Sequence, residues 1–147
     1  WTGGREATTQ FADGFALLVT SSASLAGLNQ RLSAAGAAAV DQRRVRPNLV
    51  LGGVQAHDED RTGPLTIHTD GGRAVVEPVK PCARCSMPDV DPDTAATGLA
   101  VADALQGYRQ DARVGGAITF GMNAIVLEGD GQVLRVGQRV TAPWRFD

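Results

Sequence analysis

The two cysteines of the chain, Cys82 and Cys85, lie three positions apart in the stretch "VKPCARCSMPDVDPDT". A C-x-x-C pair can bring two thiolates onto one metal ion, which is the chemistry of zinc knuckles. A structural zinc site needs four ligands, however, and the sequence has no second C-x-x-C and no histidine pair at H-x3–5-H spacing. The spacing by itself therefore argues against zinc.

Other roles for the two sulfurs are a redox pair, a packing role and a reactive thiolate. A thioredoxin-type redox pair needs C-x-x-C at the start of a helix, and the proline- and aspartate-rich segment that follows is poorly suited to start one. Two small buried residues would be the commonest role of free cysteines. Lys80 and Arg84 argue against it, because positive neighbours favour the thiolate, which binds metals and attacks electrophiles. The residues alone leave a packing role and a metal-binding or reactive role open.

Two acidic clusters could also carry chemistry. Asp89, Asp91 and Asp93 alternate as in a calcium loop, but the twelve-residue spacing with a terminal Glu is missing, so Asx-type turns are favoured. His57 is followed by the acidic residues 58–60, which could form an acid/base or metal cluster. No partner stands at a motif spacing, so a solvated loop is favoured there.

Length and composition limit the class of protein. At 147 residues with a formal net charge of −2, the chain has the size of one domain and no global charge that favours nucleic acid or a membrane surface. It contains no apolar run long enough to span a membrane and no signal-peptide pattern, which predicts a soluble cytoplasmic protein. Residues 1–10 are polar and begin with Trp1 rather than Met. We expect a flexible N-terminal segment there, a single domain over 11–147, and a chain that is a piece or a short form of something longer.

The pattern of apolar and turn residues predicts many strands and two helices. Strands are expected at 15–21, after Pro47, at 63–69 and 73–79 as a hairpin, and as two or three strands over 117–142 around a "GDG" turn. Helices are expected at 21–36, ending at Gly36, and at 97–110. Trp144 and Phe146 are expected to seal one end of the fold or to form an exposed patch. Short strands with few helices are typical of a β-barrel or sandwich with helical excursions.

Several ordered motifs together resemble the MOSC domain, the molybdenum-cofactor sulfurase C-terminal domain. They are "RPNLVLGG", the acidic "EDR", "VKPCARC" with "VDPDT", "FGMNAIVL" and "GQVLRVGQRV", which span residues 11–141 with the upstream stretch "FADGFALLVTSSASLAGLNQRL". That upstream stretch is similar to the branch that contains the mitochondrial amidoxime-reducing component and its bacterial counterparts. The resemblance implies a mainly β fold, a MOSC-type β-barrel with two or so helical excursions.

The resemblance also implies a molybdenum cofactor, molybdopterin carrying molybdenum, with the Cys85 thiolate on the metal as the catalytic residue. The cofactor-binding residues that it implies are Arg46, Asn48, Ala83, Arg84, Asn123, Gly14 and Phe15. Gly14 and Phe15 stand where relatives have polar residues or proline, so only backbone contacts are expected from them. The side chains suit their roles, because a guanidinium can grip an anionic group with two N–H donors and an amide can pair with a pterin edge.

The activity implied by the resemblance is that of a small oxidoreductase that reduces N-hydroxylated compounds. Its partners would be a small-molecule substrate and an electron-donor protein, with neither nucleic acid nor a membrane involved. Relatives carry a preceding β-rich domain that adds basic residues to the cofactor cleft, and we expect this domain to be absent from the chain. Two alternatives are a non-catalytic carrier of cofactor or sulfur, and a degenerate domain without a ligand.

Overall fold

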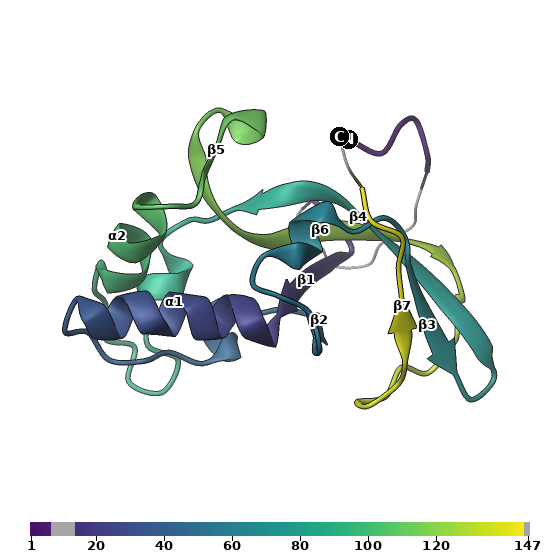
Figure 1. Ribbon diagram of the computed structural model, residues 1–147, viewed down its shortest axis with the longest axis horizontal. Coiled ribbons are helices and arrows are strands. Elements are labelled where there is room, and N and C mark those ends of the chain that lie inside the picture. The colour runs from purple at the N-terminus through teal and green to yellow at the C-terminus, as the bar shows by residue number, and fades with distance from the viewer. Residues whose placement is uncertain (7–13, 146–147) are drawn as a thin grey trace.

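A single curled sheet dominates the computed structural model, which describes residues 1–6 and 14–145 (Figure 1). The strands are β1 (Leu17–Ser21), β2 (Leu49–Leu51), β3 (Leu65–Thr69), β4 (Gly72–Ala83), β5 (Gln110–Asp111), β6 (Ala117–Glu128) and β7 (Val140–Thr141). The helices are α1 (Ser22–Ala34) and α2 (Ala100–Gln106), with short 3-10 turns η1 (Gln42–Arg44), η2 (Asp58–Arg61), η3 (Met87–Asp89) and η4 (Ala112–Val114). The predicted mainly β fold is confirmed, as a half-barrel with two helices beside one end.

The strands follow the order β2-β1-β6-β4-β3-β7, with β5 beside β6. The long strands β4 and β6 pair antiparallel and form the spine of the half-barrel, while β1 and β2 pair in parallel. The register of the β4–β6 pair shifts between Val75 and Val76 and again just after Pro78 and Pro81. A proline cannot donate to the ladder, and bulges bend a strand, so these prolines help to curl the sheet.

Two apolar clusters hold the elements together. The first fills the inside of the half-barrel with Val19, Leu65, Val76 and Ala124 among its buried members. The second lies beneath the helices and comprises Leu28, Leu32, Val45, Val101, Leu105 and Phe120. Leu28 and Leu32 are four positions apart, so they share the face that α1 turns toward this cluster.

The ends of α1 follow from its sequence. The Ser21 hydroxyl accepts a hydrogen bond from Ser24 N at 3.0 Å, which caps the first turn. Gly36 has a φ of 74°, the left-handed conformation that commonly ends a helix. The predicted helix is confirmed. The second helix, α2, is shorter than predicted and begins only at Ala100. In its first turn, Val101 N donates a hydrogen bond to the carboxylate of Asp89 at 2.9 Å.

The predicted hairpin is confirmed as β3 and β4, and residues 117–142 contain two strands, β6 and β7, as predicted. After β6 the chain passes through Gly129, with a φ of 93°, and the next strand, β7, pairs with β3. Trp144 bridges Thr62 beyond β7 and is half-exposed, while Phe146 lies outside the described residues. The expected flexible segment 1–10 also falls partly outside them. Across the described residues, no helix has the length and apolar character needed to cross a membrane.

Candidate functional site

Arg84 joins the C-x-x-C segment to the turn before β2. Its Nη1 donates to Cys82 Sγ at 3.2 Å, and its Nη2 donates to the carbonyl oxygen of Val45 at 3.0 Å. Its backbone N–H donates to the carbonyl oxygen of Ile118 in β6 at 2.9 Å. One side chain thus brings together two motifs that are far apart in the sequence.

The two sulfurs occupy different environments. Cys82 lies within β4 and is half-buried, whereas Cys85 follows the end of the strand and is exposed. Cys82 accepts the hydrogen bond from Arg84, and Cys85 has no hydrogen-bond partner among residues 1–6 and 14–145. A buried packing role is therefore wrong for Cys85. Its thiol is open to a ligand.

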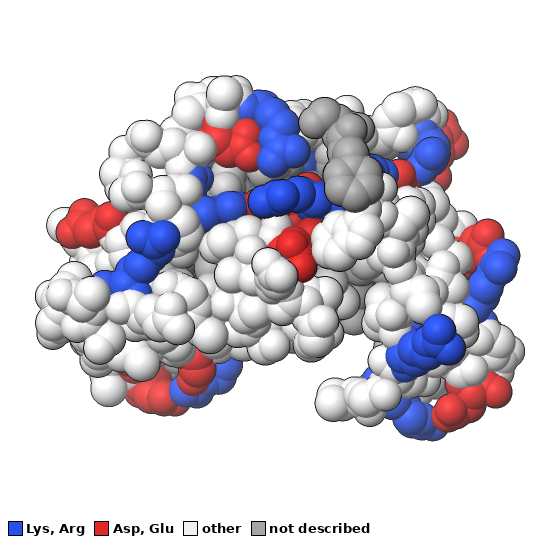
Figure 2. All heavy atoms as spheres, in the orientation of Figure 1, with Lys and Arg blue, Asp and Glu red and all other residues white. Residues whose placement is uncertain are grey.

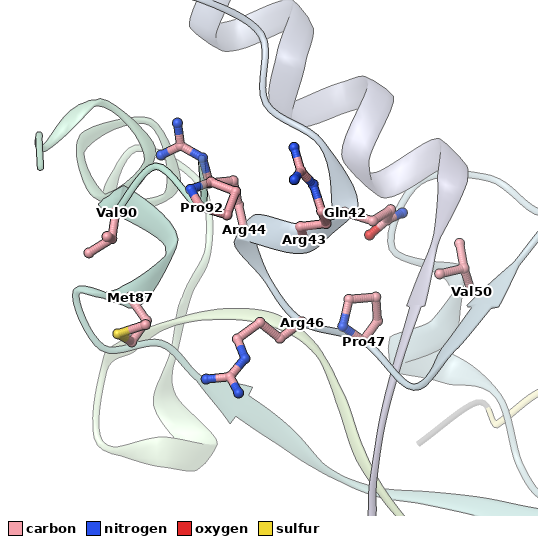
Figure 3. A pocket seen from close by; sticks show the side chains of 9 residues that line it. All are labelled: Gln42, Arg43, Arg44, Arg46, Pro47, Val50, Met87, Val90 and Pro92. Atoms are coloured by element: carbon pink, nitrogen blue, oxygen red, sulfur yellow. The ribbon is translucent and has the colours of Figure 1, made fainter. Parts of the chain in front are cut away.

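The turn before β2 carries a strained arginine. Arg46 has a φ of 56°, in the left-handed region that residues other than glycine rarely adopt. Its side chain is exposed and has no acidic partner within the described part of the chain. Figure 3 shows this side chain extending from the turn toward the side of the pocket that carries Met87. A free guanidinium here can take an anionic group.

A pocket of about 610 Å³ lies between this turn and the segment that follows Cys85 (Figure 3). It is lined by Gln42, Arg43, Arg44, Arg46, Pro47, Val50, Met87, Val90 and Pro92. Apolar side chains from the segment after β4 face basic side chains from the turn. Such a mixture suits a ligand with an apolar body and an anionic group.

Two ion pairs hold the walls of this pocket together. Arg43 donates to both oxygens of Asp93 at 2.8 Å, and Arg44 donates to Asp91 at 2.7 Å. The hydrogen bond from Arg43 lowers the pKa of Asp93. Asp91 also accepts from the backbone N–H groups of Asp93 and Thr94, which confirms the predicted Asx turn there. On the face that Figure 2 shows, several Lys and Arg side chains lie beside Asp and Glu.

Sequence reasoning missed Arg43 and Arg44 as part of the site. The available signal was the run of arginines in "DQRRVRPN" together with the alternating acids in "DVDPDT". Complementary charge alone could not pair them, because the two stretches are separated by β2, β3 and β4.

The other residues implied by the resemblance surround Leu18 of β1. The Asn48 side-chain oxygen accepts from Leu18 N at 2.8 Å, and Asn48 N donates to the carbonyl oxygen of Leu18 at 2.9 Å. Asn123 of β6 stands opposite Leu18 on one side and Lys80 of β4 on the other. The turn of Arg46 is therefore fastened to β1 beside Asn123, and the Asn48 oxygen is used in that fastening.

The remaining implied residues lie near these elements. Ala83 is exposed and pairs with Thr119 across β4 and β6. Gly14 is exposed and Phe15 is half-buried, just before β1 begins. Their expected contacts with a ligand stay predictions.

The acidic segment after His57 is not the solvated loop that its composition predicts. Glu59 is fully buried, its carboxylate accepts from the Ser24 hydroxyl at 2.6 Å, and burial raises its pKa. Asp60 pairs with Arg109 at 2.7 Å. Burial lowers the pKa of His57 to about 4. These residues fasten η2 to α1 and to the segment between α2 and β5, a role that a run of polar residues does not reveal.

The described residues contain no group of three or more His, Cys, Asp or Glu side chains placed to hold a metal ion. A metal that arrives with its own ligands needs only one protein sulfur.

Three groups in the C-x-x-C segment and in the turn before β2 have properties that fit an anionic, metal-bearing ligand. The Nε of Arg84 is buried without an acceptor among the described residues. The Arg46 guanidinium and the Cys85 thiol are exposed and unpaired within the same residues. A buried N–H normally finds an acceptor, so the Arg84 donor favours an added oxygen or sulfur acceptor at this place. A soft thiolate suits a transition metal.

Comparison with known proteins adds one finding. A family model with the description "MOSC domain" matches residues 6–141 of the chain. No curated protein matches the chain.

Proposed function

Because this chain belongs to the MOSC domain family, we propose that it binds a molybdenum cofactor with the Cys85 thiolate as a ligand of the metal. We further propose that it serves a small oxidoreductase that reduces N-hydroxylated compounds, as in the branch of the amidoxime-reducing component. The observation that carries the proposal is the contact between Arg84 and Val45 at 3.0 Å. This contact joins Arg84, which precedes Cys85 in the chain, to Val45, which precedes Arg46.

The residues of the chain would divide the work of binding. Arg46 and Arg84 would hold the anionic part of the cofactor with charge-assisted hydrogen bonds, and Asn123 would pair with a polar edge. Asn48 would act through the backbone of β1, since its side-chain oxygen already accepts from Leu18. When bound, the cofactor supplies two-electron and oxygen-atom transfer, while the protein supplies position and electrostatics.

The proposal includes partners. Turnover would need electrons from a donor protein, and a preceding β-rich domain would complete the walls of the cofactor cleft. The exposure of Arg46 supports the second point, because cofactor sites normally bury most of the ligand.

A carrier of cofactor or sulfur is the second candidate function. It is favoured by the exposure of Cys85, since a thiol that passes a group to another protein must be accessible. Such a carrier would use the same Cys85 sulfur but would not catalyse a reaction. This function would be favoured if the protein bound molybdenum but did not reduce any N-hydroxylated compound when a chemical reductant supplied the electrons.

Metal analysis after addition of molybdenum cofactor tests the proposal. We expect stoichiometric molybdenum in the wild-type protein and in Cys82→Ser, and none in Cys85→Ser. Cys82→Ser is the matched control because it removes the other sulfur of the same motif. An absence of molybdenum from the wild-type protein would contradict the proposal, and equal loss in both variants would remove the special role of Cys85.

A further inference from the structure

We propose that Cys82 is a positioning residue, whose sulfur, together with the carbonyl oxygen of Val45, holds the guanidinium of Arg84 in one orientation for ligand binding. The inference starts from the hydrogen bond between Arg84 Nη1 and Cys82 Sγ at 3.2 Å. The role of this hydrogen bond in ligand binding rests on the proposed function, in which the cofactor binds at Cys85. The geometry itself does not depend on that proposal.

The guanidinium of Arg84 is held at two of its three nitrogens. Nη1 donates to the sulfur of Cys82, and Nη2 donates to the carbonyl oxygen of Val45. A guanidinium is planar and rigid, so fixing both terminal nitrogens also fixes the direction of the Nε–H bond. That third donor is buried and has no acceptor among the described residues.

Both anchors of Arg84 sit on ordered parts of the fold. Val45 is 1% exposed and belongs to the core cluster beneath the helices. Cys82 lies within β4, which pairs with β6 along its length. Without the sulfur, the guanidinium would keep only the Val45 carbonyl as an acceptor and could turn about it.

The sulfur of Cys82 is therefore separate in role from that of Cys85. Cys85 is exposed and open to a ligand, whereas Cys82 is half-buried and already accepts a hydrogen bond. A cysteine is not essential for this role, because a hydroxyl oxygen can accept from a guanidinium in the same way. Ser at position 82 should preserve the arrangement, and Ala should not.

Nuclear magnetic resonance of the arginine Nε–H groups tests the geometry in protein that carries no cofactor. We expect a slowly exchanging Arg84 signal in the wild-type protein and in Cys82→Ser. In Cys82→Ala the signal should exchange as fast as those of exposed arginines. The Arg84→Lys variant identifies the signal, because it removes it.

Molybdenum retention in the same variants tests the consequence. After loading with molybdenum cofactor and dialysis, Cys82→Ala should retain about tenfold less molybdenum than Cys82→Ser, the scale of one lost hydrogen bond to a charged group. Thermal midpoints of the two variants should agree, which excludes a general loss of structure.

The outcomes separate this inference from the proposed function. A slowly exchanging Arg84 signal in Cys82→Ala would overturn the inference and leave Cys82 as a packing residue. If the wild-type protein binds molybdenum, equal retention in the Ala and Ser variants would overturn it as well. If the signals behave as expected while the wild-type protein binds no molybdenum, the positioning of Arg84 stands and the proposed function fails.

Discussion

Arg46 combines backbone strain with an unpaired charge. A left-handed φ of 56° costs a residue with a Cβ atom about 1 kcal/mol relative to glycine. Glycine at this position would avoid the strain, yet would provide no guanidinium beside the pocket. Backbone strain of this kind is common at binding sites, where the contact with the ligand matters more than the stability lost to the strain.

Replacing Arg46 separates the two properties. We expect Arg46→Gly to raise the free energy of unfolding by about 0.5 kcal/mol, because relief of strain slightly exceeds the added entropy of the unfolded chain. Arg46→Ala keeps the strain and should unfold like the wild-type protein. Both variants should lose bound molybdenum. Urea unfolding and metal analysis measure the two effects, and full metal retention in Arg46→Ala would contradict a binding role.

His57 gives the fold a predictable dependence on pH. Its pKa is about 4 in the folded protein, because burial disfavours the charged ring, against an ordinary value of about 6.5. Between these values the unfolded chain binds a proton that the folded chain does not, so stability falls as the pH falls from about 6.5 to about 4. The ring is partly exposed, which reduces the expected loss to about 1 kcal/mol.

A comparison with His57→Asn isolates this effect. Asparagine tolerates the left-handed backbone of position 57, where φ is 67°, and does not titrate. Glu59 and Asp60, whose pKa values are raised by burial, contribute a slope of opposite sign in both proteins. The acid-side loss should therefore be smaller in the variant when urea unfolding is followed at pH 7 and pH 4.5. Parallel pH profiles would show that His57 contributes nothing.

At the scale of elements, the approach of β1 to β6 decides where the site residues stand. Gly121 of β6 has a φ of 76°, and a Cβ there would lie 2.6 Å from the carbonyl oxygen of Val19. Only glycine allows the two strands to come this close. The pairing that results puts Asn123 opposite Leu18, which in turn holds Asn48.

Gly121→Ala should disrupt this pairing. Because the contact with Val19 is with its backbone, which cannot move aside cheaply, we expect a loss of about 3 kcal/mol or more in the free energy of unfolding. Gly98→Ala is the control, since no described residue other than its chain neighbours has an atom within 4 Å of its Cβ position. Denaturant unfolding of both variants gives the comparison. A wild-type midpoint in Gly121→Ala would show that β1 and β6 have room to separate.

At the scale of the whole molecule, Glu77 links segments from both ends of the chain. This glutamate lies in the middle of the sequence, its side chain is 7% exposed, and it pairs with both Arg5 and Arg145. Arg145 Nη2 donates to Glu77 at 2.6 Å, and Arg145 N donates to the carbonyl oxygen of Arg61 at 2.7 Å. Figure 1 shows these segments converging above β4.

Arg145→Met should destabilise the protein by about 2 kcal/mol, because a buried carboxylate then keeps only the Arg5 partner. Arg135→Met is the control. Arg135 and Asp70 form an ion pair with side chains 61% and 81% exposed, so its loss should cost about 0.5 kcal/mol or less. Thermal unfolding distinguishes them, and equal effects would argue that the Glu77 pair is as weak as the exposed pair.

The sequence by itself determined the fold class, the hairpin of β3 and β4, helix α1 and the motifs of the candidate site. These features follow from apolar periodicity, turn residues and motif spacing, all of which are local. The tertiary structure alone decided which sulfur Arg84 contacts, that Glu59 is buried, and that β7 pairs with β3. Each of these depends on residues distant in the chain that folding brings within a few ångströms, and no local pattern encodes that proximity.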